Sequence, residues 1–184
     1  MKRKVIIYAL PILCILMVGC DSTRIKENNE VSNENTEFKN TEFVNTEEEL
    51  INALTNDYSV TITDNITSNN ELIIEGEFLK TDTTEENNVI SVGRKLNLYS
   101  KDDNNNVINN YVLEAPSLTI QSENTVIKGG TFIGDVYIEA KGFEIDNTKI
   151  KGNLYFKNEE AKGTFVKSNA SSVQGKISVK EKES

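Results

Sequence analysis

The sequence predicts an all-β protein: a short single-stranded parallel β-helix, or solenoid, of about five to six coils with an N-terminal capping helix. Two observations indicate this fold. Apolar–x–apolar triplets, each typical of one face of a strand, recur along the 184-residue chain. Three of these triplets near the C-terminus lie in segments that can be aligned residue by residue. An antiparallel β-sandwich is the alternative fold.

The first residues are typical of a secretory signal. Met1–Lys4 is positively charged, and an almost wholly apolar run extends from Val5 to Gly19. This run is shorter than the roughly 20 residues that span a bilayer. Met17-Val18-Gly19-Cys20 resembles a bacterial lipobox. The resemblance implies that residues 1–19 are a lipoprotein signal peptide and that Cys20 is acylated, as with palmitate. A plain signal peptide or an uncleaved anchor is the alternative.

Composition excludes several kinds of active site. The chain has no histidine, and its two cysteines, Cys14 and Cys20, both lie near the N-terminus. A histidine-based triad, a histidine-ligated zinc site and a cysteine-ligated metal in the body are therefore excluded. Removal of residues 1–19 would lower the basic residues from 20 to 17, against 29 acidic ones. This acidic excess argues against nucleic acid, and we expect no cofactor and no metal.

The chain after the signal divides into a tether and a domain. Residues 20–45 are rich in Asn, Glu, Thr and Ser, which predicts a flexible acidic tether. The β-helix domain is expected over residues 46–184. Thr46 and Glu49 form a capping box that opens a helix, and Asn56-Asp57 ends it. We expect four apolar residues on the buried face of this helix, namely Leu50, Ile51, Ala53 and Leu54.

A near-period in the triplets is the strongest evidence for a solenoid. The triplets from Leu72 to Ile177 begin at nearly regular intervals, with two equal steps between Leu118 and Leu154. Gly134, Gly152 and Gly175 occupy equivalent places in the three aligned segments, which predicts a corner of special backbone conformation. The triplets are Val60/Ile62, Leu72/Ile74, Leu96/Leu98, Leu118/Ile120, Val136/Ile138, Leu154/Phe156 and Ile177/Val179, with Thr125/Ile127 and Phe143/Ile145 between them.

The turn chemistry favours stacked parallel coils over hairpins. Asn-Gly and Asp-Gly, the strongest signals of a short hairpin, are absent from this Asn-rich chain. Asparagine can instead lie at successive corners of a solenoid and bond to the neighbouring coil.

The helix and the triplets together resemble a known architecture. Thr46, Glu49, Leu50, Ala53 and Leu54, followed by Val60-Thr61-Ile62, are similar to the start of pectate-lyase-like right-handed β-helix proteins. The resemblance covers about residues 44–180 and implies that the helix closes one end of the stack. It implies a fold and no particular function. The Gly-Asp-Val, Gly-Asn-Leu and Gly-Lys-Ile corners are also similar to those of bactofilins, which implies end-to-end self-association.

Few residues suggest catalysis. Arg94 is the one arginine after residue 24, and Asp102-Asp103 lie in a predicted solvated turn rather than a calcium loop. Four carboxylates lie close in sequence, whereas a glycosidase needs two carboxyl groups about 5–10 Å apart in a cleft, and nothing in the sequence indicates a cleft. They alternate with lysines, which favours charge pairing on a solvated face. These carboxylates are Asp135, Glu139, Glu144 and Asp146, and the lysines are Lys141, Lys149, Lys151 and Lys157. We therefore expect no catalytic residues.

The expected function follows from the location and the scaffold. Tyr137 and Tyr155 occupy equivalent outward places one coil apart and are the expected ligand face. We expect a membrane-anchored, surface-exposed lipoprotein, held by its N-terminal lipid on the extracytoplasmic face of the cell membrane. Its non-catalytic β-helix would serve binding or adhesion, with a protein or polysaccharide as ligand. The alternatives are a self-associating, bactofilin-like structural module that assembles end to end and a polysaccharide-active enzyme.

Overall fold

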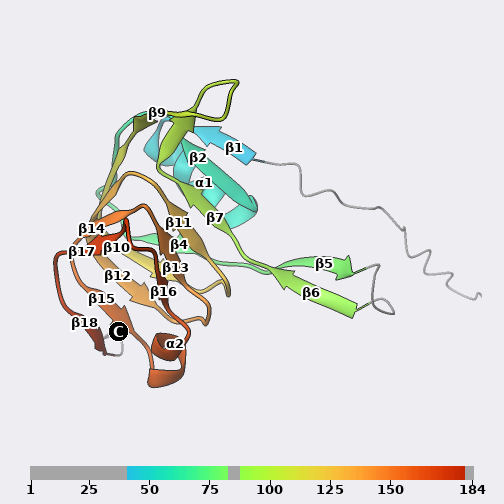
Figure 1. Ribbon diagram of the computed structural model, residues 1–184, viewed down its shortest axis with the longest axis vertical. Helices are drawn as coiled ribbons and strands as arrows, with labels where there is room; N and C mark the ends of the chain where they lie inside the picture. Colours follow the sequence, from blue (N-terminus) through green and yellow to red (C-terminus); the bar gives the residue numbers. More distant parts are fainter. Residues whose placement is uncertain (1–40, 83–87, 181–184) are drawn as a thin grey trace, which may run out of the picture. The chain divides into compact units, whose positions relative to one another are not determined.

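The computed structural model describes residues 41–82 and 88–180 and shows a mostly β fold (Figure 1). The signal peptide, Cys20 and the tether up to residue 40 lie outside the described residues. Two larger sheets, one of six strands and one of eight, contain only parallel pairs. The expected all-β class is confirmed, and the antiparallel sandwich is wrong.

The six-stranded sheet has the order β1-β2-β7-β11-β13-β16, so its neighbours follow one another along the chain. In the eight-stranded sheet, β17-β14-β12-β10-β3 form one path, while β4 pairs with β10 and β15 pairs with β12 and β18. The strands of the first sheet are β1 (Thr41–Val44), β2 (Ser59–Ile62), β7 (Lys95–Asn97), β11 (Val126–Lys128), β13 (Glu144–Asp146) and β16 (Val166–Lys167). Those of the second are β3 (Ile66–Thr67), β4 (Leu72–Ile74), β10 (Val112–Ile120), β12 (Thr131–Ile138), β14 (Lys149–Lys151), β15 (Leu154–Phe156), β17 (Ser172–Val173) and β18 (Ile177–Val179).

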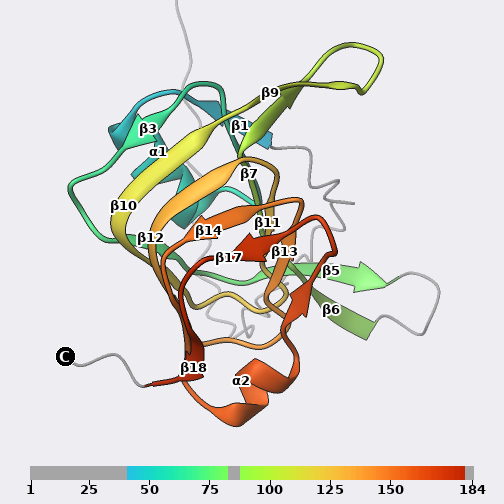
Figure 2. The same ribbon diagram turned by 60° about the vertical axis from the view of Figure 1, so that its left-hand side comes forward.

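Two antiparallel hairpins interrupt this pattern, although no Asn-Gly or Asp-Gly is present. They are β5 (Phe78–Asp82) with β6 (Asn88–Val92), and β8 (Tyr99–Lys101) with β9 (Val107–Asn110). Figure 2 shows both hairpins projecting from the two sheets. Each pair of strands is joined by five residues, so neither needs the two-residue turn that those dipeptides favour. The expectation of no hairpins was therefore wrong for this part of the chain.

The first helix, α1 (Glu47–Asn56), begins where the capping signal predicts. Thr46 is its N-cap, and the Thr46 Oγ1 accepts from the Glu49 N–H at 3.3 Å. The Glu49 carboxylate accepts from the N–H of Asn45, one residue before the expected partner. Leu50, Ala53 and Leu54 are buried as expected. Ile51, which was also expected on the buried face, is instead 41% exposed, because it faces the hollow between α1 and the segment of Leu72–Ile74.

The tether is shorter than expected at its C-terminal end. β1 lies inside the predicted range of 20–45 and pairs in parallel with β2, and Val44 is only 1% exposed. Phe43 and Val44 are the apolar residues that mark this strand. A second helix, α2 (Glu159–Gly163), was not expected; Asn158 caps it by accepting from the Ala161 N–H.

The register corrects the predicted period. Leu118 pairs directly with Leu72, whereas Leu96 lies in the other sheet beside Val60 and Ile127. The first two steps of the near-period, from Leu72 to Leu96 and from Leu96 to Leu118, therefore each connect strands of different sheets. Both hairpins lie between Leu72 and Leu118 and lengthen this segment.

Further along the chain, the predicted period is confirmed. The register pairs Leu118 with Val136, Val136 with Leu154, and Leu154 with Ile177. These are the partners that the triplets predict for successive turns of the chain.

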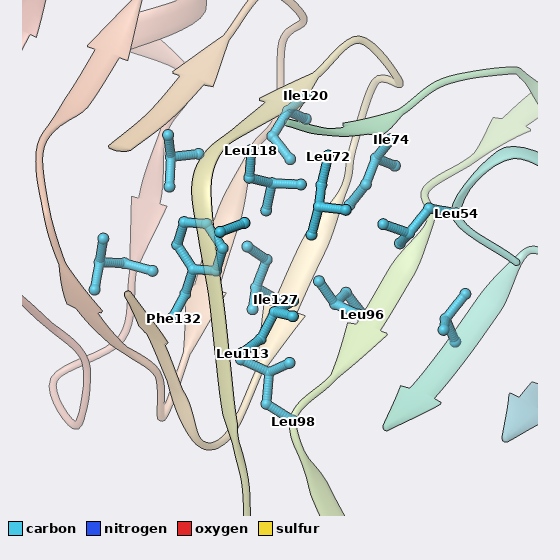
Figure 3. Close-up of a cluster of buried hydrophobic side chains, with 14 of the residues drawn as sticks. Leu54, Leu72, Ile74, Leu96, Leu98, Leu113, Leu118, Ile120, Ile127 and Phe132 are labelled. Atoms are coloured by element: carbon cyan, nitrogen blue, oxygen red, sulfur yellow. The ribbon is translucent and has the colours of Figure 1, made fainter. Parts of the chain in front are cut away.

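The core lies between the sheets and consists mainly of apolar side chains. Figure 3 shows Leu72, Leu118 and Ile120 of the eight-stranded sheet together with Leu96 and Ile127 of the six-stranded sheet. Leu54 reaches the same cluster from α1. Continuous packing of residues this well buried provides the main free energy of folding.

Candidate functional site

The expected ligand face lies on the outer side of the eight-stranded sheet. Tyr137 of β12 and Tyr155 of β15 are register partners, and their ring centroids are 5.2 Å apart at an interplanar angle of 32°. Both side chains are half-buried. The Lys180 Nζ lies 5.4 Å from the centroid of the Tyr155 ring, within the range of a cation–π contact. We call Tyr137 and Tyr155 the tyrosine face.

The tyrosine face belongs to a regular row of outward side chains. Successive register partners in this row are Ile73, Thr119, Tyr137, Tyr155 and Ser178, of which Thr119 is buried. Residues two positions further along each strand form the next outward row, because alternate residues share a face of a strand. That row runs from Glu75 and Gln121 through Glu139 to Lys157 and Lys180, so it changes from acidic to basic.

On the other side of the tyrosines, a hydrogen-bonded ladder runs along the corner of the sheet. Asp135 Oδ1 accepts from the N–H and the Nδ2 of Asn153, both at 2.8 Å. Asn153 Oδ1 in turn accepts from the Lys176 N–H at 2.9 Å. This arrangement confirms for Asn153 the expectation that asparagine bonds to the neighbouring turn of chain. It also keeps Asp135 occupied in holding the backbone.

Glycines bring the backbone close at this corner. A Cβ on Gly152 would lie 1.9 Å from the Gly134 carbonyl oxygen, so only glycine allows the contact. Gly134 has a φ of +142°. The expected special conformation is therefore present at Gly134, whereas the requirement at Gly152 comes from close approach.

The other carboxylates are surface groups with mixed contacts. Glu139 accepts from the Gln121 Nε2 at 3.2 Å, and Asp146 lies 3.9 Å from the Nζ of its register partner Lys128. Lys141 pairs instead with Glu160 at 2.6 Å, which raises the pKa of Lys141. Asp146 thus has a cross-strand partner, but this partner is Lys128 and not one of the four lysines expected. Among the described residues, no group of three or more acidic, histidine or cysteine side chains could hold a metal ion.

Arg94 is part of the core and not a surface base. This residue is 2% exposed, and its guanidinium donates to the carbonyl oxygens of Glu75, Ala53 and Asp57. Burial lowers the pKa of Arg94, while the charges of Asp57 and Glu75 oppose that shift. The contacts join the C-terminal end of α1 to the end of β4. Sequence reasoning missed this role, because a buried arginine leaves no periodic pattern.

The Asp102 loop is a structured turn. Asp102 Oδ1 accepts from the N–H groups of Asn104 and Asn106, both at 2.9 Å, and Asn105 has a φ of +65°. These bonds, first of all those from Asn106, lower the pKa of Asp102. The predicted turn is confirmed. Its carboxylate is engaged by the loop's own backbone.

The described surface also has hollows of modest volume. One, of about 230 Å³, lies beside the second hairpin, and one, of about 310 Å³, lies beside Pro116 and Gly134. A third, of about 150 Å³, lies between α1 and β4 and is lined by Ile51, Leu54, Thr55, Glu71, Leu72, Ile73 and Glu75. At most, these volumes reach the lower end of those typical of small-molecule pockets.

No family model, curated protein or solved structure matches the chain. Within residues 41–82 and 88–180, no helix is long and apolar enough to cross a membrane.

Proposed function

We propose that this protein is a lipid-anchored, surface-exposed bacterial lipoprotein whose non-catalytic domain binds a protein or polysaccharide through the tyrosine face. The observation that carries the proposal is the Tyr137–Tyr155 pair, with ring centroids 5.2 Å apart on a sheet backed by a closed apolar core. Paired rings on a rigid support offer apolar contact area at little cost in conformational entropy.

The scaffold in this proposal is a short parallel β-helix of about five to six coils. Support comes from the register, in which successive segments of chain contribute one strand to the six-stranded sheet and either one long strand or two short strands to the eight-stranded sheet. The steps between register partners from Leu118 to Ile177 are of the length expected of single coils. The cap helix α1, with Leu50, Ala53 and Leu54 buried, lies at the start of the stack.

A role in binding is favoured over catalysis by what the polar groups contact. Asp135 is held by Asn153, Glu139 accepts from Gln121, and Arg94 is buried against backbone carbonyls. A polysaccharide-active enzyme would need two carboxyls facing each other across a bound sugar. The carboxylates near the tyrosine face serve the sheet instead.

The anchor is tested on the full-length chain. We expect wild type and Cys14→Ser to sediment with membranes, with a mature N-terminus at an acylated Cys20. Cys20→Ser should lose the acyl groups, because the sulfur that carries the lipid is gone. Mass spectrometry of the N-terminal peptide is the measurement. An unmodified Cys20 in the wild-type protein would show that the anchor proposal is wrong.

The ligand face is tested by binding of the full-length chain, held in lipid nanodiscs, to a printed array of bacterial and host polysaccharides and matrix proteins. We expect Tyr137→Ala and Tyr155→Ala each to lower binding of any spot recognised by wild type by about tenfold. Tyr99→Ala, on the second hairpin, is the matched control and should bind as wild type. Equal binding by all three variants would exclude the tyrosine face.

A structural module that self-associates through its C-terminal end is the second candidate. Ile177 and Val179 favour it: they align with the buried Leu154 and Phe156, yet they are 42% and 37% exposed. Light scattering of the detergent-extracted wild-type protein over a range of concentrations tests this candidate, which requires a mass that rises with concentration.

A further inference from the structure

The C-terminal end of the eight-stranded sheet is an open edge. β18 pairs only with β15, and within the described residues no strand lies beyond it (Figure 2). Its two apolar residues, Ile177 and Val179, each keep more than a third of their surface exposed. An edge strand with exposed apolar residues is a template for another chain. This end therefore lacks the cover that α1 gives to the other.

The backbone of β18 directs hydrogen-bonding groups toward this edge. The N–H of Lys180 donates to the carbonyl oxygen of Phe156 at 2.9 Å, so this residue faces β15. Successive residues of a strand point their N–H and C=O groups to opposite sides, so those of Ile177 and Val179 face away from β15. β18 has no described strand on that side to pair with them. The same two residues thus offer both apolar side chains and backbone donors and acceptors.

Lysines flank the edge strand on the outer face of the sheet. Lys176 precedes β18 and Lys180 follows it, and both are exposed. Lys180 also contacts the ring of Tyr155, which lies on that outer face. Residues 147–180 contain seven lysines and only two glutamates, and both glutamates belong to α2 and already pair with lysines. The open edge is therefore basic.

This charge disfavours a second copy of the chain at the edge. Two β18 strands related by a two-fold axis would bring the lysines of both copies together, and like charges across a contact are destabilising. The acidic part of the domain lies at the other end, where residues 41–78 contain nine acidic residues and no basic one. That end is already covered by α1. A partner at the edge must therefore bring acidic residues of its own.

We propose that β18 binds an extended acidic segment of another protein as an added strand. Residues of that segment opposite Ile177 and Val179 lie on the core face and are apolar. Residues opposite Lys176 and Lys180 lie on the outer face and are acidic. The recognised pattern is acidic–apolar–x–apolar–acidic, which is the same in either direction of the added strand. This site is separate from the tyrosine face and does not depend on it.

Fluorescence anisotropy of a labelled peptide tests the site on the full-length protein in phosphatidylcholine nanodiscs. The probe is Gly-Glu-Val-Thr-Val-Glu-Gly, and the control peptide carries lysine in place of both glutamates. We expect the wild-type protein to bind the probe at least tenfold more tightly than the control peptide, because the lysines of the edge attract the one and repel the other. Equal binding of the two peptides, or binding of neither, would overturn the proposal.

A proline substitution tests the backbone pairing. Val179→Pro removes an N–H that faces the edge and leaves the bonds between β18 and β15 in place, because proline is tolerated where the N–H of an edge strand faces solvent. Val179→Ala is the matched control, since it shortens the side chain and keeps the N–H. We expect Val179→Pro to weaken binding of the probe at least tenfold and Val179→Ala to weaken it about threefold. Similar binding by the two variants, both folded by circular dichroism, would contradict strand addition.

Charge reversal tests the preference for an acidic segment. Lys176→Glu with Lys180→Glu should reverse the preference, so that this variant binds the lysine-containing peptide more tightly than the probe. Lys95→Glu with Lys101→Glu, both exposed and on β7 and β8, is the matched control and should keep the wild-type preference. If the variant at Lys176 and Lys180 keeps that preference too, the charge pairing is wrong.

Other sites and other occupants of the edge give different results. Tyr137→Ala should bind the probe as wild type, because Tyr137 lies on β12, two strands from the edge. A loss as large as that of Val179→Pro would instead place the peptide on the tyrosine face. If the wild type ignores the probe but forms oligomers in light scattering, a second copy occupies the edge. If the probe binds only after deletion of residues 21–40, the tether occupies it. Each of these three results overturns the proposal, and the array test of the tyrosine face is independent of them.

Discussion

The two ends of the paired sheets differ in how their apolar residues are covered. At the N-terminal end, α1 buries Leu50 and Leu54, and Arg94 ties the helix to β4 through backbone carbonyls. At the C-terminal end, Ile177 and Val179 keep over a third of their surface exposed. Apolar residues at equivalent register positions can thus contribute very different amounts to the free energy of folding. A side chain is fully buried only where a further strand or helix covers it on each side.

Removal of Arg94 should have the largest effect on the sealed end. Arg94→Leu removes the guanidinium that donates to the carbonyl oxygens of Glu75, Ala53 and Asp57, and we expect a loss of about 3–5 kcal/mol in unfolding free energy. Urea denaturation followed by circular dichroism is the measurement. Lys95→Leu, at the exposed neighbouring position, is the control and should change stability little. Equal stability of Arg94→Leu and wild type would contradict the conclusion that Arg94 holds α1 against β4.

Truncation of one apolar residue at each end compares the two directly. Leu54→Ala should cost about 2–4 kcal/mol, because Leu54 is 2% exposed and leaves a cavity. Ile177→Ala should cost about 1 kcal/mol or less in dilute solution, because Ile177 is 42% exposed. The same urea experiment measures both variants. Similar losses would mean that the C-terminal end is covered by something beyond β18.

Low pH should lower the free energy of unfolding by a smaller amount, through the loss of contacts between α1 and the loop before β4. Glu47 accepts from the Ser68 Oγ at 2.7 Å and the Asn70 Nδ2 at 2.9 Å, and these bonds lower the pKa of Glu47 from its ordinary value of 4.5. A lowered pKa stabilises the fold above about pH 4.5, and this contribution is lost as pH falls through the folded pKa.

Glu47→Gln should therefore flatten the fall in stability between about pH 5 and pH 3. Glu48→Gln, at the next exposed position of the same helix turn, is the matched control. Urea midpoints measured across this pH range provide the test. An unchanged pH profile in Glu47→Gln would show that these hydrogen bonds do not tie α1 to the Ser68–Asn70 loop.

The sequence allowed prediction of what depends on local pattern. Thr46 and Glu49 mark the start of α1 because capping uses residues three apart. The rows after Leu118 were predictable because the same offset repeats there. The row through Leu96 was not, because two hairpins lengthen that segment and move the expected partner to the other sheet.

The candidate site was predictable only in part. Tyr137 and Tyr155 follow from the repeat, and the register confirms that they are neighbours. The contact of Lys180 with Tyr155 depends on the register of β18 against β15, and no local sequence pattern predicts that contact. The separation of charge between the ends is visible in the sequence, since no basic residue occurs from 41 to 78. The net charge of the whole chain does not show this uneven distribution.

The ladder of Asp135, Asn153 and Lys176 has a direction. Each side-chain oxygen accepts from the backbone of the turn that follows it in the chain. A nascent chain, which emerges N-terminus first, thus presents each of these acceptors before its donor is synthesised. Each new turn of chain can therefore bond to the turn that is already folded. Folding at this corner would then proceed from the N-terminal end of the sheets, which α1 covers, toward the C-terminal end.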